Sequence, residues 1–125
     1  MEGKGKKIVF IEDESRLQEV FKTFFEERGY KLFSAYDGEN GLKLAESEMP
    51  DLIILDLILP KKNGFDVLKE LKENPRLKDI PVIVLTNLEG GQDIERAFSL
   101  GAKAYLIKSN YNLDELIEKI EELTK

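Results

Sequence analysis

The sequence predicts an α/β fold, a (βα)5 doubly wound, parallel five-stranded sheet with helices on both faces. Three observations favour this fold. Short apolar segments alternate five times with segments of helical periodicity. The connections between them are short, as in a chain of strand–helix units. Residues 52–55 and 82–85 contain only Leu, Ile and Val, which is typical of strands buried on both faces of a parallel sheet.

Composition narrows the class of protein further. The chain of 125 residues has room for one domain with a core, and its net charge of −6 argues against direct nucleic-acid binding or a membrane surface. Because Cys and His are absent, disulfides, thiolate or imidazole metal ligands and histidine acid–base chemistry are excluded. We expect residues 1–5 to form a short basic tail and residues 6–125 a single domain. No signal-peptide pattern or bilayer-length apolar run is present, so a cytoplasmic protein is expected.

The first two units follow from periodicity and capping. Residues 7–11 are expected to form a strand and residues 15–28 a helix, which Gly29 ends with a left-handed C-cap. Residues 30–35 are less uniformly apolar, which favours a strand nearer the sheet edge. The apolar face of the first helix is predicted to consist of Leu17, Val20, Phe21, Phe24 and Phe25.

The second helix is predicted to start after Asp37, its N-cap, and to continue through residue 48 until Pro50 ends it. Its apolar residues are Leu42, Leu44, Ala45 and Met49. The third strand, residues 52–55, then leads to a third helix over about residues 65–73, which Asn74-Pro75 ends.

The last two units complete the alternation. The fourth strand, residues 82–85, precedes a short helix around residues 94–98 that ends at Gly101. A fifth strand over residues 104–107 leads to a final helix over residues 113–123, where Asn112 and Glu115 form a capping-box pattern.

Polar residues directly follow four of these strands. They are Glu12 and Asp13, Asp56, Thr86 and Lys108. Parallel strands with right-handed crossovers place all their carboxyl ends at one edge, where ligands bind in open α/β sheets.

If the first and third strands are neighbours, three carboxylates share one cleft. Two like charges ~4 Å apart at an effective dielectric of ~20 repel by ~4 kcal/mol. Their pKa values therefore rise, or a cation lies among them. Oxygen ligands favour Mg²⁺, with Mn²⁺ or Ca²⁺ as alternatives.

The same edge suggests a chemistry. The Lys108 ammonium and the Thr86 hydroxyl beside a metal suit a phosphoryl group, and the Asp56 carboxylate can act as a nucleophile that forms an acyl phosphate. Each residue also has a simpler explanation, as a helix cap, a turn residue or a solvated lysine. It is not expected that all four of these simpler explanations hold at the same edge of the sheet, so a shared functional site is favoured.

These residues together resemble the receiver domain of bacterial response regulators in two-component signalling. At this length the chain is most similar to a stand-alone, chemotaxis-regulator-like receiver. The resemblance covers about residues 6–123 and implies the flavodoxin-like strand order 2-1-3-4-5. Its motifs are Glu12-Asp13, Asp56-Leu57-Ile58-Leu59-Pro60 with Gly64, Thr86 and Lys108.

The resemblance also implies a role for each motif residue. Asp56 would accept a phosphoryl group from a phosphohistidine on a histidine kinase or phosphotransfer protein. Mg²⁺ (or Mn²⁺) would be bound by Asp13, Asp56 and the backbone carbonyl of Ile58, with Glu12 acting mainly through water. Lys108 would pair with the phosphoryl oxygens.

A switch is implied in the same way. Thr86 would move toward the phosphoryl group and Tyr105 would rotate inward behind it. The face formed by the fourth helix, fifth strand and fifth helix would then bind an unknown downstream protein. Such a protein promotes its own phosphotransfer and dephosphorylation and is not a turnover enzyme. For Tyr105, a packing role explains the residue equally well.

Two positions depart from the family pattern. Ser109 follows Lys108 where the family usually has a cis proline, and a cis bond before a non-proline residue costs ~2.5–4 kcal/mol, so a trans bond is expected. Asn87 stands where the family tends to have a small residue, and it is expected to narrow access to Asp56. These departures leave open a phosphorylation-independent interaction module, or pseudo-receiver.

Two further classes are disfavoured by the residues themselves. A flavodoxin-like electron carrier would need a Gly/Ser/Thr-rich phosphate loop, and residues 12–14 are acidic instead. The glycine-rich motifs of nucleotide-binding enzymes do not occur.

Overall fold

The computed structural model of the chain describes residues 3–125 and contains one parallel five-stranded sheet. Its strands lie in the order β2-β1-β3-β4-β5, which confirms both the predicted fold class and the predicted strand order. The strands are β1 (Lys7–Ile11), β2 (Lys31–Ala35), β3 (Leu52–Leu55), β4 (Val82–Thr86) and β5 (Ala104–Ile107). The less apolar β2 lies at an edge, as expected.

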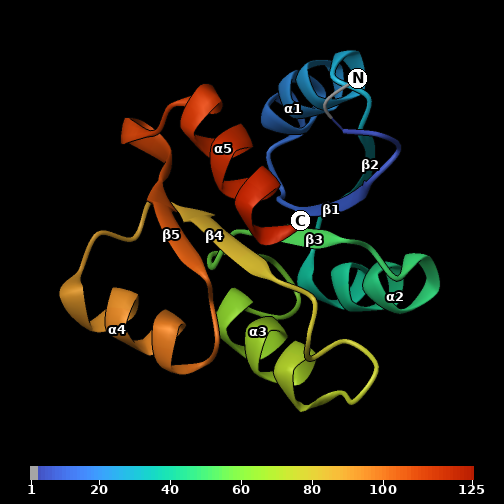
Figure 1. Cartoon of the computed structure of the whole chain (residues 1–125). Coiled ribbons are helices and arrows are strands. Elements are labelled where there is room, and N and C mark those ends of the chain that lie inside the picture. Colours follow the sequence, from blue (N-terminus) through green and yellow to red (C-terminus); the bar gives the residue numbers. More distant parts are fainter. Residues whose placement is uncertain (1–2) are drawn as a thin grey trace.

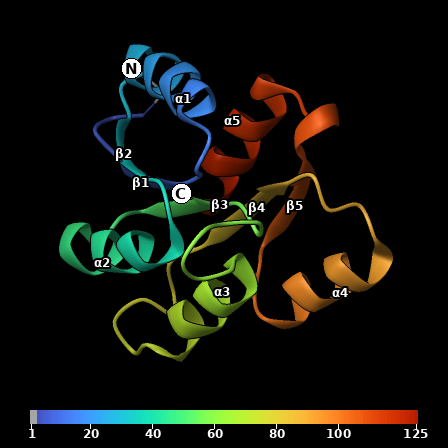
Figure 2. The same cartoon turned by 180° about the vertical axis from the view of Figure 1, so that it is seen from behind.

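Helices cover both faces of the sheet. Figures 1 and 2 show α1 and α5 on one face and α2, α3 and α4 on the other. The helices are α1 (Ser15–Glu27), α2 (Gly38–Glu48), α3 (Gly64–Glu73), α4 (Gly91–Ser99) and α5 (Leu113–Leu123), and a 3-10 turn (Lys108–Asn110) follows β5. No described helix is long and apolar enough to cross a membrane.

The core is divided in two by the sheet, because successive side chains of a strand point to opposite faces. Val9, Ile53 and Val84 pack under α2, α3 and α4, together with Leu68 and Leu71 of α3. The opposite core, under α1 and α5, contains Phe10, Ile54, Leu85, Phe21, Phe25, Leu116 and Ile120. The Phe10 and Phe21 rings stack with centroids 4.5 Å apart.

The strand register brings the predicted site residues to one edge. Ile11 pairs with Leu55, so the chain continues from these two neighbours into Glu12 and Asp56. On the other side of β3, Thr86 pairs with Ile107, the residue before Lys108. Because all pairings are parallel, four strand ends open toward the same side.

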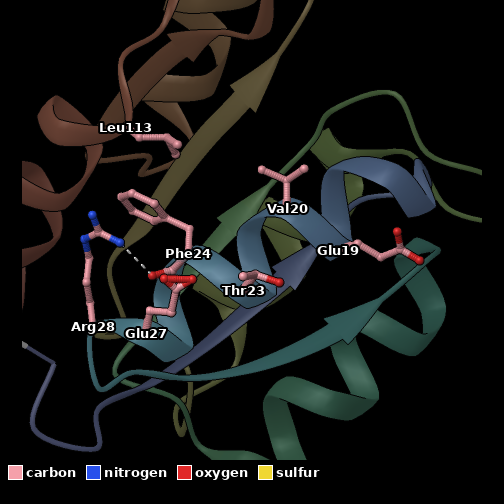
Figure 3. Close-up of a pocket in the computed structure, with 7 residues that line it drawn as sticks. All are labelled: Glu19, Val20, Thr23, Phe24, Glu27, Arg28 and Leu113. Carbon is pink, nitrogen blue, oxygen red and sulfur yellow. Dashed lines mark hydrogen bonds between the residues drawn. The ribbon is translucent and has the colours of Figure 1, made fainter.

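The predicted apolar face of α1 is wrong at one position. Val20 is 47% exposed, whereas Gln18 is buried in line with Phe21 and Phe25. Val20 lies instead in a groove of about 560 Å³, which Phe24 and Leu113 also line (Figure 3). A glutamine can take the inner position because its amide nitrogen donates to carbonyl groups at the strand ends.

Met49 is the second correction. It does not belong to the apolar face of α2 but ends the helix in the left-handed conformation, with φ of 46° and a side chain 42% exposed. The following Pro50 disfavours the right-handed helical conformation at Met49, which explains this ending.

The caps predicted at Asp37, Asn112, Gly29 and Gly101 are present, but among the described residues the Glu115 carboxylate does not accept from the Asn112 N–H as a full capping box requires. The Asp37 carboxylate accepts from the Asn40 N–H at 2.8 Å, and the Asn112 side chain accepts from the N–H groups of Asp114 and Glu115. Gly29 and Gly101 have φ values of 88° and 107° at the helix ends. The α3 helix starts at Gly64, one residue earlier than expected, and β4 includes Thr86.

Part of the predicted tail contacts the domain. The N–H of Gly3 donates to the Arg28 carbonyl and that of Gly5 to the Gly29 carbonyl, both at 2.8 Å. Met1 and Glu2 of this tail lie outside the described residues.

Candidate functional site

Asp56 lies at the centre of the edge formed by the strand ends and is 3% exposed. Its backbone N–H donates to the Ile11 carbonyl at 3.0 Å, which fixes the end of β3 against β1. Its Oδ1 accepts from the Ile58 N–H at 3.2 Å. A side chain at Gly64 would collide with the Asp56 backbone carbonyl, so glycine lets the start of α3 pack directly against this loop.

Lys108 joins two of the buried carboxylates. Its Nζ lies 2.7 Å from Asp56 Oδ2 and 2.6 Å from Glu12 Oε1. Burial alone would lower the pKa of Lys108, but the hydrogen bonds to Asp56 and Glu12 raise that pKa above its ordinary value. The ammonium therefore stays charged and offsets part of the negative charge of the cleft.

Glu12 is fully buried at the end of β1. Burial raises its pKa from 4.5 to about 7, and the Asp56 charge adds to this, although Lys108 and the Glu14 N–H favour the ionised form. Its Oε2 accepts from the Glu14 N–H at 3.0 Å. A cation beside Glu12 would favour ionisation at neutral pH.

The three acidic residues fit a hard divalent cation. Glu12, Asp13 and Asp56 each offer a carboxylate oxygen, and these oxygens lie within 4.8 Å of one another. Oxygen ligands of one Mg²⁺ at ~2.1 Å each are up to ~4.2 Å apart, so small side-chain rotations are enough. Asp13 is exposed and faces solvent, while the other two are buried. The donor set therefore suits Mg²⁺ or Mn²⁺.

Thr86 contributes a buried hydroxyl beside these charges. The residue is fully buried, and among the described residues its Oγ1 has no hydrogen-bond partner. An unpartnered buried hydroxyl costs about 1–3 kcal/mol, and a functional role for Thr86 would account for this cost. A phosphoryl oxygen on the neighbouring strand end would provide the missing acceptor.

Tyr105 lies on β5, two strands from β3. Its hydroxyl donates to the Leu88 carbonyl at 2.7 Å, and its ring lies 6.4 Å from that of Phe98 on α4. The tyrosine thus connects β5 to the segment between β4 and α4, directly after Thr86.

A small cleft of about 160 Å³ opens over Asp56, and Asp13, Ile58, Asn87 and Lys108 also line it. Ile58 is 56% exposed at its rim. Asn87 thus lies beside Asp56 at the cleft, and the narrowing of access by its side chain stays a prediction. All peptide bonds of the described residues are trans, which confirms the prediction for Ser109.

Sequence reasoning missed one residue at this edge. The Gln18 side chain reaches from α1 to the carbonyl groups of Phe10, Glu12 and Ala35. The sequence did contain a signal for this position. Gln18 precedes Phe21 by three residues and Phe25 by seven, a spacing that places all three on the same face of a helix.

Comparison with known sequences agrees with this geometry. The family model of the response regulator receiver domain matches residues 8–121. The transcriptional regulatory protein CiaR of Streptococcus pneumoniae is 43% identical over 119 residues, which are 95% of this chain and 51% of that protein. The chain thus spans about half the length of the curated relatives it matches.

Solved structures agree as well. The receiver domain of a sensor histidine kinase from Pseudomonas aeruginosa, with a magnesium ion coordinated in its active site cleft, superposes with a TM-score of 0.86 at 26% identity, covering 96% of this chain and 98% of that one. The Mn²⁺-bound form of response regulator Rcp1 gives a TM-score of 0.78 at 32% identity, covering 94% and 91%. With its fold, its strand-end residues and these matches in agreement, the chain belongs to the response regulator receiver domain family.

Proposed function

We propose that this protein is a phosphorylation-dependent signalling switch in which Asp56 accepts a phosphoryl group. One observation carries the proposal. The Lys108 ammonium contacts Asp56 and Glu12 at once, beside a cleft that gives access to Asp56. This arrangement places a cation, a nucleophilic carboxylate and a cluster of metal-binding oxygens together.

The donor would be a phosphohistidine on a histidine kinase or phosphotransfer protein. An oxygen of ionised Asp56 attacks the phosphorus, a P–O bond forms and the P–N bond breaks. The electron pair of that bond goes to the imidazole nitrogen, which takes up a proton. Water later attacks the acyl phosphate and releases inorganic phosphate, so the protein is modified and restored without turning over an external substrate.

Each neighbouring group has a role in this transfer. Glu12, Asp13, Asp56 and the backbone carbonyl of Ile58 would hold Mg²⁺ or Mn²⁺. When bound, this ion would neutralise charge on the phosphoryl oxygens. Lys108 would exchange its contact with the Asp56 carboxylate for one with a phosphoryl oxygen. The Thr86 hydroxyl would donate to another.

The modification would be transmitted through β4 and β5. A shift of Thr86 moves the segment that ends at Leu88, whose carbonyl accepts from Tyr105. Tyr105 would then change position together with α4, where Phe98 is 46% exposed. The α4–β5–α5 face would present a different surface to a downstream protein, a population shift between two states. A cytoplasmic setting is part of this proposal, since the donor kinases act there.

One alternative function, a pseudo-receiver, is supported by a residue of the cleft. A pseudo-receiver on this fold would bind partners without phosphorylation, and the Asn87 side chain that lines the cleft favours it by restricting access. The contacts of Lys108 argue for the phosphoacceptor, because a pseudo-receiver has no need for two buried carboxylates around a lysine.

A small phosphodonor tests the proposal directly. With acetyl phosphate and Mg²⁺, intact-protein mass spectrometry should detect the addition of one phosphoryl group. Asp56→Asn should abolish the addition, whereas Asp51→Asn, at an exposed aspartate before β3, should preserve it. A wild-type protein that stays unmodified with donor, metal and a competent kinase present would contradict the phosphoacceptor role.

A further inference from the structure

Gln18 is buried beside the acidic strand end, and the proposed chemistry assigns it no role. Its side chain is 1% exposed and occupies the inner face of α1 next to aromatic residues. Placing an amide in such surroundings costs free energy unless its polar atoms are bonded. Among the described residues the Gln18 Oε1 has no hydrogen-bond partner, so only the amide nitrogen offsets this cost. The hydrogen-bond partners of the amide nitrogen therefore indicate its structural role.

The amide nitrogen of Gln18 holds three carbonyl groups together. Its Nε2 lies 3.0 Å from the Phe10 carbonyl, 3.0 Å from that of Glu12 and 3.1 Å from that of Ala35. Two N–H groups are shared among these three acceptors. The carbonyls belong to the carboxyl ends of β1 and β2 and to the first residue after β1. The amide thus ties both strand ends to α1 where the chain turns.

These contacts close a ring around the turn. Gln18 donates its own backbone N–H to the Glu14 carbonyl at 3.1 Å. The Glu14 N–H donates to Glu12 Oε2 at 3.0 Å, and the Glu12 carbonyl accepts from the Gln18 amide. Three hydrogen bonds therefore hold the turn at residues 12–14: one between backbone groups, one to the Glu12 carboxylate and one from the Gln18 side chain of α1.

Asp13 lies in the chain between Glu12 and Glu14, two residues of this ring. Its carboxylate has no hydrogen bond or ion pair among the described residues, although it is one of the three oxygen donors of the cleft. With no side-chain partner to orient it, its position is set by the backbone of residues 12–14. The ring fixes that backbone.

We propose that Gln18 is a positioning residue for metal binding. Its amide holds the turn at residues 12–14 so that the Glu12 and Asp13 carboxylates stay within reach of the same cation as Asp56. This inference rests on the proposed metal site. Groups that orient metal ligands from behind typically change metal affinity by about 10–100-fold when removed.

Gln18→Met tests the inference, because methionine keeps the length of the side chain and removes the amide. Titration calorimetry with Mg²⁺, at a pH well above the Glu12 pKa of about 7, should show a Kd raised about tenfold. The matched control is Phe25→Leu, on the same buried face of α1, which should lower the melting temperature and leave the Kd unchanged. An unchanged Kd in folded Gln18→Met overturns the inference, whereas a wild-type protein that binds no Mg²⁺ overturns the proposed metal site as well.

A second measurement uses the wild-type protein and does not depend on how the variant folds. The side-chain amide resonances of Gln18 should be protected from solvent exchange. They should also shift during a Mg²⁺ titration with the same half-saturation as the Asp13 backbone amide. Gln18 amide resonances that stay unmoved while the Asp13 amide saturates would contradict the proposal.

Discussion

Glu12 shows how burial changes the chemistry of a single residue in this cleft. It is fully buried and shares Lys108 with Asp56, and its pKa is raised to about 7, chiefly by burial. A proton therefore occupies Glu12 in part of the metal-free protein at neutral pH. Because a cation competes with that proton, metal affinity should increase with pH.

The raised pKa predicts a pH-dependent stability for the metal-free protein. The native state holds the Glu12 proton more tightly than the unfolded chain does. Its stabilising contribution is thus complete below about pH 4.5 and is lost as the pH rises through about 7. We expect the free energy of unfolding, measured by urea titration with a chelator present, to fall over this interval by about 3 kcal/mol relative to Glu12→Gln.

Glu12→Gln is the control in that comparison, because it removes the titrating group and keeps the shape of the side chain. Carboxyl groups away from the cleft titrate alike in both proteins and cancel. Parallel pH profiles for the two proteins would refute the assignment of a raised pKa to Glu12.

Helix α5 is one of the helices with a side-chain N-cap. It follows the 3-10 turn that contains Lys108 and starts where the Asn112 side chain accepts from two backbone N–H groups. Leu116 and Ile120 of this helix pack on the sheet. The cap therefore fixes the start of a helix that forms part of the proposed output face.

Removing this cap should weaken the domain. Asn112→Ala leaves the N–H groups of Asp114 and Glu115 without their acceptor, and we expect a loss of about 1 kcal/mol in the free energy of unfolding. The matched control is Asn110→Ala, at an exposed position in the preceding turn, which should change stability by less than about 0.5 kcal/mol. Equal losses in both variants would exclude capping as the cause.

At the scale of the whole molecule, the strand order connects the cleft to a distant face. Asp56 follows the central strand, and Lys108 follows the edge strand β5, on which Tyr105 contacts the β4–α4 segment. In the proposed switch, a change at Asp56 would reach α4 through Lys108, β5 and the contacts of Tyr105 with Leu88 and Phe98. The proposed switch requires these contacts to have two alternative arrangements, one for each state of Asp56.

Lys108→Ala should separate phosphorylation from the response. We expect Asp56 to remain modifiable by acetyl phosphate with Mg²⁺, because the carboxylates remain. Without the ammonium, however, the phosphoryl group cannot draw the end of β5 toward it. Hydrogen exchange across α4, β5 and α5 should then change on phosphorylation of the wild type but not of Lys108→Ala.

The control for this prediction is Lys103→Ala, at an exposed lysine before β5, which should respond as the wild type does. An unchanged response in Lys108→Ala would contradict the role assigned to Lys108.

Much of the fold could be predicted from local patterns. The uniformly apolar β3 and β4, the helix caps Asp37 and Asn112, and the left-handed Gly29 and Gly101 all depend on a few neighbouring residues. The polar residues after four strands also indicated the site, because parallel strands must end at the same edge.

Contacts between distant segments decided the features that local sequence patterns could not predict. Hydropathy in α1 favours Val20 over Gln18 as the inner residue, because the carbonyl partners that allow the glutamine to be buried come from β1, β2 and Glu12, outside the helix. The contacts of Lys108 with Asp56 and Glu12, the raised pKa of Glu12 and the unpartnered Thr86 hydroxyl likewise arise between distant segments. By itself the sequence determined which residues reach the cleft, because strand ends and periodicity are local. Only the folded chain decided how those residues are paired and charged, because burial and hydrogen bonding depend on neighbours far away in the sequence.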